Sequence, residues 1–172
     1  MKNTIIKYGL ISGAISAVCM GVMGFILKSG GNNGFDNTMY VGFTLIFLAM
    51  AVIFLGIKAY RDKENDGKVS FGKGLMIGLG IALISSVCYS LMWLVVHYNF
   101  MPNFIEDYAN YTIEKLKASG ASEADLLKTQ EQNDFFKDMY KSPLGVFAVT
   151  LIEPLPIGIV IALIAAFILK RK

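Results

Sequence analysis

One carboxylate, Glu153, stands alone in the apolar stretch 143–169, and two prolines, Pro154 and Pro156, follow it closely. A charge at bilayer depth costs about 2.5–3.5 kcal/mol or more, and intramembrane carboxylates commonly bind ions or relay protons. Proline breaks the interior of a helix but is tolerated in the first turn. The pattern therefore predicts a short helix over 144–152. A second helix should start near Pro154, where its N-terminal dipole favours the Glu153 anion.

The depth of Glu153 limits its role. Counted back from Leu169 at 1.5 Å per residue, it lies about 24 Å above the inner boundary of a hydrocarbon core about 30 Å thick. It therefore belongs to the outer third of the span. Residues of other spans near the same level are Gly21, Phe43, Thr44, Tyr89 and Ser90. Three roles stay open for Glu153: a helix start, the handling of a proton or cation, and contact with a partner.

His97, the single histidine, is the other candidate functional residue, near the outer end of an apolar stretch. No cysteine or acidic cluster lies at ligand spacing from it, so the sequence predicts no metal site. Because imidazole titrates near neutrality, a proton or pH sensor is the alternative to an ordinary interfacial histidine. Cys19 and Cys88 both lie inside apolar stretches, which favours a packing role over a disulfide.

Catalytic motifs are missing from the sequence. It contains no G-x-S-x-G, no H-E-x-x-H and no pair of glutamates within a span. The glycine-rich stretch 29–34 matches no phosphate-binding pattern and is expected to form a flexible turn. The basic residues are dispersed, which suits membrane orientation and anionic lipid better than nucleic acid. We therefore expect no enzymatic activity, no cofactor and no nucleic-acid partner.

The elements that position these residues are four long apolar stretches. The chain of 172 residues is 55% hydrophobic and only 17% charged, whereas a soluble domain carries about 25% charged residues. The expected spans cover 5–27, 38–59, 74–100 and 144–169, and each reaches the roughly 20 residues that cross a bilayer. A soluble bundle would need polar helix faces that these stretches lack. The first is also longer than the apolar core of a signal peptide, so we expect a retained span.

The charges of the loops predict the orientation. Ten of the 16 basic residues fall on one side of a four-span chain: Lys2, Lys7, Lys58, Arg61, Lys63, Lys68, Lys73, Lys170, Arg171 and Lys172. The loop 102–142 has five lysines against eight acidic residues. Basic residues in short loops stay inside, so both termini are expected in the cytoplasm and the loop 102–142 outside.

The loop 102–142 is expected to fold as a helical hairpin. Apolar residues recur at helical spacing over 103–118, and Gly120 suits the end of that helix. Ser122 with Asp125 three residues later resembles a capping box at the start of a helix over 123–140. The hairpin would either dock a partner or lie on the membrane as a connector. The prediction is thus an all-α polytopic membrane protein, one membrane domain over 1–172, with an extracytoplasmic helical hairpin between spans three and four.

Two rows of small residues recur every fourth position. The first row is Gly9, Gly13, Ala17 and Gly21, and the second is Gly74, Gly78, Ala82, Ser86 and Ser90. Small residues four apart let two helix backbones approach closely in lipid. The rows predict that spans one and three form the closely packed centre, within one chain or between subunits. A shift of 69 residues also aligns 16–19 with 85–88, as in a parallel repeat of two plus two spans.

Three segments resemble a known family. They are Lys58-Ala59-Tyr60-Arg61-Asp62-Lys63, Val69-Ser70-Phe71-Gly72-Lys73-Gly74 and Glu153-Pro154-Leu155-Pro156-Ile157-Gly158. Together they resemble a bacterial four-span family catalogued as domain of unknown function 4199, over nearly the whole chain. The resemblance implies four spans and an inner-membrane location. It implies no activity, cofactor or catalytic residue.

The expected function is that of a small inner-membrane protein, a non-enzymatic subunit or accessory factor of a membrane complex. Its partners would be the lipid bilayer and a protein partner or a second copy. The alternative is a small transporter or channel in which Glu153 handles a proton or cation.

Overall fold

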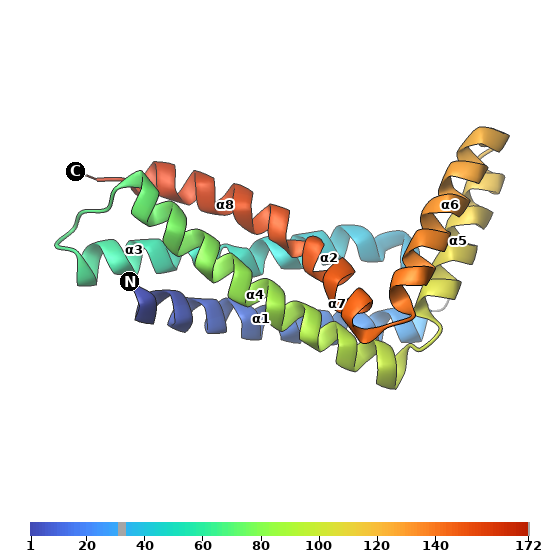
Figure 1. Cartoon of the computed structure of the whole chain (residues 1–172), viewed down its shortest axis with the longest axis horizontal. Helices are drawn as coiled ribbons and strands as arrows, with labels where there is room; N and C mark the ends of the chain where they lie inside the picture. The colour runs from blue at the N-terminus through green and yellow to red at the C-terminus, as the bar shows by residue number, and fades with distance from the viewer. Residues whose placement is uncertain (31–33, 172) are drawn as a thin grey trace.

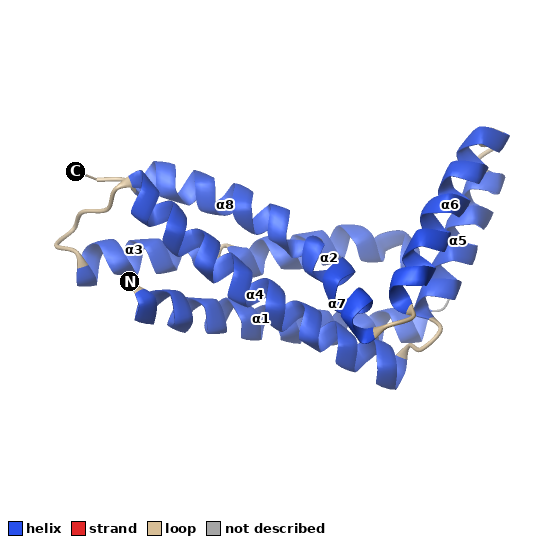
Figure 2. Cartoon of the chain, in the orientation of Figure 1, coloured by secondary structure: helices blue, strands red, loops and turns tan. Residues whose placement is uncertain are grey.

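Helices make up nearly all of the structure, which is a computed structural model that describes residues 1–30 and 34–171. The described part forms these α-helices (Figures 1 and 2): α1 Lys2–Gly30, α2 Gly34–Met50, α3 Val52–Glu64, α4 Phe71–Phe100, α5 Phe104–Ala118, α6 Glu123–Tyr140, α7 Pro143–Ile152 and α8 Pro154–Leu169. An isolated antiparallel bridge joins Val69 to Arg171. Of the turn predicted at 29–34, residues 31–33 lie outside the described residues, whereas residues 29 and 30 belong to α1 and residue 34 to α2.

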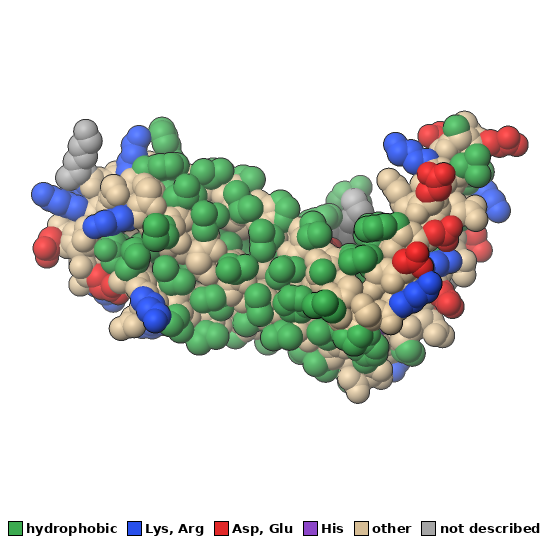
Figure 3. Space-filling view, in the orientation of Figure 1, with side chains coloured by type: hydrophobic (Ala, Val, Ile, Leu, Met, Phe, Trp, Pro, Cys, Tyr) green, Lys and Arg blue, Asp and Glu red, His purple; other side chains and the backbone are tan. Residues whose placement is uncertain are grey.

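Four segments are long and apolar enough to cross a membrane: Lys2–Lys28, Tyr40–Glu64, Phe71–Phe100 and Pro143–Leu169. The prediction of an all-α protein with four membrane-spanning helices is therefore confirmed. The flank of the bundle exposes large apolar side chains, such as Val18 and Phe25 at 64% and 73% exposure, as expected for contact with lipid. Charged side chains gather beyond its two ends (Figure 3).

The spans run along one another as a bundle with distinct ends. The two termini and the loop between α3 and α4 lie at one end, and α5 and α6 stand at the other (Figure 1). The first and third spans, α1 and α4, run in the same direction, because Gly9 of α1 faces Ile84 and Gly13 faces Cys88. An added Cβ at Gly13 would lie 2.6 Å from the Cys88 sulfur, so glycine is needed there for the close approach.

Spans one and three pack against each other as the rows predict, but the second row adds a contact that was not predicted. Gly74 faces Ala166, Gly78 faces Ala162 and Ala82 touches Gly158, so this row packs against α8 rather than α1. Small residues on both sides bring α4 and α8 together with antiparallel backbones, where dispersion forces hold them. The first row lies against larger α4 side chains instead. The centre of the bundle is thus α4, which packs on α1 with one face and on α8 with another.

The second span is broken, which the sequence prediction of one continuous span over 38–59 missed. Helix α2 ends at Met50 and α3 begins at Val52, with Ala51 between them in a helical backbone conformation. The Ala51 amide is shared between the carbonyls of Phe47 and Leu48, at 3.0 and 3.3 Å. Nearby, Ser12 of α1 donates to the Ala49 carbonyl at 2.8 Å. A side chain that enters the hydrogen-bond ladder is a recognised cause of such a kink.

The helices α5 and α6 lie side by side beyond the spans. The Gly120 backbone has φ +72°, the left-handed conformation that ends α5 and favours glycine. The Ser122 hydroxyl accepts from the Asp125 amide at 3.2 Å and so caps α6. Buried Asn133 of α6 donates to the Thr112 hydroxyl of α5 at 3.1 Å and links the two helices.

Gly78→Ala is expected to lower the free energy of unfolding by about 1–3 kcal/mol, because the contact is already tight. The new Cβ would lie 2.7 Å from the Ala162 Cβ and 3.1 Å from its Cα. The control is Gly72→Ala in the same helix, where nothing lies within 4 Å. This control should leave stability unchanged or raise it, because alanine favours helix. Thermal unfolding in detergent measures both, and equal effects would contradict the α4–α8 contact.

Candidate functional site

The candidate site lies where the fourth span breaks. Helix α7 ends at Ile152 and α8 begins at Pro154, as the two prolines predict. Proline has no N–H, so Pro154 cannot donate to the Thr150 carbonyl four residues earlier. Instead, the Glu153 amide donates to the Thr150 carbonyl, at the longer distance of 3.3 Å. Because the Glu153 backbone stays helical at φ −67° and ψ −57°, the break is a change of bonding and direction, not a reversal.

The Glu153 side chain bonds to α4. The Tyr89 hydroxyl donates to Glu153 Oε2 at 3.0 Å, while the carboxylate makes no capping bond to the first turn of α8. Tyr89 is 7% exposed, whereas Glu153 is exposed at the flank of the bundle. The sequence placed both residues at one depth but did not identify Tyr89 as the partner. The carboxylate is therefore anchored from inside the bundle and reachable from its side.

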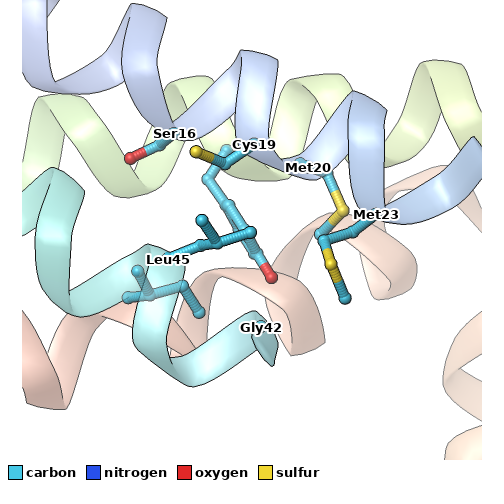
Figure 4. Close-up of a pocket in the computed structure, with 8 residues that line it drawn as sticks. Ser16, Cys19, Met20, Met23, Gly42 and Leu45 are labelled. Carbon is cyan, nitrogen blue, oxygen red and sulfur yellow. The ribbon is translucent and has the colours of Figure 1, made fainter. Parts of the chain in front are cut away.

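A small cavity lies on the other side of Tyr89. Its volume is about 10 Å³, close to the space that one water needs. It lies between α1 and α2 (Figure 4), and its lining is Ser16, Cys19, Met20, Met23, Gly42, Leu45, Ile46 and Tyr89. Tyr89 therefore separates the Glu153 carboxylate from a cavity in the bundle.

A line of buried serines continues inward from this cavity. Ser16 and Ser85 lie 2.9 Å apart, and so do Ser85 and Ser12. The Ala49 carbonyl can only accept, so Ser12 donates its single hydroxyl hydrogen to this carbonyl. The Ser85 hydroxyl then donates to the Ser12 oxygen. Ser16 and Ser85 are one of the four pairs that the 69-residue shift aligns. The line joins α1, α4 and the kink of the second span.

Two further serines of α4 are buried in the bundle. Ser90 donates to the Ser86 carbonyl of its own helix at 3.0 Å, the usual way for a serine to bond within a membrane helix. The Ser86 side chain is fully buried, yet its hydroxyl has no hydrogen-bond partner among the described residues. A buried hydroxyl left unpaired costs about 1–3 kcal/mol.

His97 belongs to an aromatic cluster at the outer end of the bundle. Its Nδ1 donates to the Met101 carbonyl at 3.0 Å, and its ring lies 5.1 Å from that of Tyr140. The structure does not bring His97 to Glu153. The Trp93 indole N–H donates to the Tyr140 hydroxyl at 3.0 Å, and Phe104 packs edge-on against Trp93. This cluster fixes α5 and α6 to the bundle.

Burial raises the pKa of Tyr140 to about 12. The phenol therefore stays neutral at physiological pH and keeps a hydrogen to donate while it accepts from Trp93. Sequence analysis missed this pair, although the matching depth of two interfacial aromatic residues was available as a signal. Within residues 1–30 and 34–171, no three His, Cys, Asp or Glu side chains form a group that could hold a metal ion.

Comparison with known proteins gives one similarity. A family model described as "Protein of unknown function (DUF4199)" matches residues 7–171. No curated protein and no solved structure matches the chain.

Tyr140→Phe should loosen α5 and α6 from the bundle. It leaves the buried Trp93 N–H unpaired, which costs about 1–3 kcal/mol. Thermal unfolding should show this loss, and hydrogen exchange at the C-terminal end of α6 should speed up. Tyr98→Phe is the matched control, because Tyr98 is 48% exposed and should tolerate the change. If the two variants behave alike, Trp93 and Tyr140 do not anchor the pair of helices.

Proposed function

Because the chain belongs to the DUF4199 family of proteins of unknown function, we propose a role from its own geometry: a non-enzymatic subunit or accessory factor of a membrane complex. The docking surface is the exposed side of α6. One observation carries the proposal: Leu127 and Phe135 of this helix are 64% and 60% exposed. They lie outside the four candidate spans, so lipid contact does not account for them as it does for the flank of the bundle.

Charge and anchoring support a protein partner over a loose connector. The stretch 102–142 carries five lysines against eight acidic residues, which favours a partner with a basic surface. Its net negative charge disfavours an anionic lipid surface. The aromatic cluster around Trp93 and Tyr140 holds the helix pair in a fixed position, which lowers the ordering cost of docking.

The proposed location is a bacterial inner membrane, with both termini in the cytoplasm and α5–α6 outside. Both termini lie at one end of the bundle, together with the loop between α3 and α4 (Figure 1). The stretches at this end, residues 1–8, 58–73 and 170–172, carry ten of the 16 basic residues. An excess of Lys and Arg near span ends is typical of the cytoplasmic side.

The double change Leu127→Ser and Phe135→Ser should abolish the complex, because it removes the apolar contacts with the partner. Both side chains are exposed, so the fold does not depend on them. Stability should change by no more than about 0.5 kcal/mol per site. The measurement is the mass of the particle purified in native nanodiscs. Lys128→Ser with Gln132→Ser on the same helix is the matched control. A particle mass that is the same for both variants and the unaltered chain would contradict docking through α6.

A second candidate function is transport, in which Glu153 handles a proton or cation. The Tyr89–Glu153 bond inside a broken span favours it, because discontinuous helices commonly form ion sites in transporters. The second span is also broken, at Ala51, and a buried serine line leads from that break toward Tyr89.

In proteoliposomes, Glu153→Gln should abolish proton or cation flux, because the amide keeps the shape but cannot carry the charge. Glu64→Gln at the opposite end of the bundle is the control and should retain flux. Vesicles with the unaltered protein that pass neither protons nor common cations would exclude this second candidate.

A further inference from the structure

The contact between α4 and α8 fixes what faces the break of the fourth span. Gly74 meets Ala166, Gly78 meets Ala162 and Ala82 meets Gly158, so each step of four residues up α4 matches four down α8. One further step of this register puts Ser86 at the level of Pro154, the first residue of α8. Ser86 therefore lies at the point where the hydrogen-bond ladder of the fourth span is interrupted.

Oxygen atoms without a full set of donors lie at this level of the bundle. The Ser86 hydroxyl is fully buried and unpartnered. The Thr150 carbonyl lies at the same break, because Pro154 cannot supply its usual N–H. The replacement among the described residues is the Glu153 amide at 3.3 Å. A carbonyl oxygen has two lone pairs, so it keeps capacity for another partner.

The charge at the break is negative. Tyr89 lies three residues from Ser86 on α4 and donates to Glu153 Oε2, which leaves the other carboxylate oxygen free to accept. The C-terminus of α7 and the N-terminus of α8 lie together here, so their opposite partial charges offset each other and the carboxylate sets the sign. No Lys or Arg lies within the fourth span to balance it. Carboxylate, carbonyl and hydroxyl oxygens together suit a hard cation.

We propose that a small monovalent cation, Na⁺ or K⁺, binds at this break. The ligands are the Glu153 carboxylate, the Thr150 carbonyl and the Ser86 hydroxyl, and Tyr89 positions the carboxylate. The exposed Glu153 gives the ion access from the flank in the outer leaflet, without passage through the bundle. The proposal deepens the second candidate function by naming the ligand class of its site, and it requires binding but not transport.

The test is thermal unfolding of the full chain in nanodiscs, followed by fluorescence of Trp93, the single tryptophan. NaCl and KCl are titrated against choline chloride at constant ionic strength. The unaltered chain should be stabilised by Na⁺ or K⁺ in a saturable way that choline does not reproduce. Ser86→Ala and Glu153→Gln should each raise the cation concentration at half-saturation at least tenfold. Ser90→Ala, whose hydroxyl already bonds within its own helix, should leave it unchanged.

Two results would overturn the site. Equal stability in Na⁺, K⁺ and choline would show that no cation binds at the break. An unchanged half-saturation in Ser86→Ala would place any bound cation elsewhere. If Glu153→Gln does not fold, Tyr89→Phe replaces it and should weaken binding in the same direction. Saturable cation binding without flux would exclude transport but support the cation site. The double change Leu127→Ser and Phe135→Ser should leave cation binding unchanged.

Discussion

Backbone hydrogen bonding inside lipid is the constraint on which this structure depends. A membrane offers no water to an unpaired N–H or carbonyl, so each interruption of a spanning helix needs a partner from the protein. The chain interrupts two of its four spans, at Ala51 and at Glu153. At the first, Ser12 of α1 donates to the Ala49 carbonyl. At the second, the Tyr89 hydroxyl of α4 donates to the Glu153 carboxylate, and the buried, unpartnered Ser86 hydroxyl lies three residues earlier on α4.

Helix α4 organises the bundle around these interruptions. Its small residues admit α8, while its larger side chains fill the space left by the glycines of α1. Farther along, Tyr89 reaches Glu153, and Trp93 one turn later holds α5 and α6 through Tyr140. The same helix therefore positions the candidate ion site and the proposed docking surface. A change in the packing of α4 would therefore shift both the candidate ion site and the docking surface.

Local patterns allowed much of this fold to be predicted from the sequence. Length and hydropathy gave the four spans, the cap at Ser122 gave the start of α6, and Pro154 gave the break in the fourth span. The kink at Ala51 could not be predicted, because it has no proline or glycine and lies beside a bond from Ser12, 37 residues away. The packing of the second row of small residues against α8 was also missed, because it joins helices that are far apart in the sequence. A row of small residues predicts that another helix packs closely, but it does not identify that helix.

A double-mutant cycle with Tyr89→Phe and Glu153→Gln tests the central claim most directly, namely that α4 holds the carboxylate of the broken span. The measurement is the free energy of unfolding of the four proteins in the same detergent. The bond at 3.0 Å predicts that the two changes are not additive, with a coupling energy of about 1–3 kcal/mol. Additive effects, with a coupling energy near zero, would show that Tyr89 does not hold Glu153 and would contradict the account.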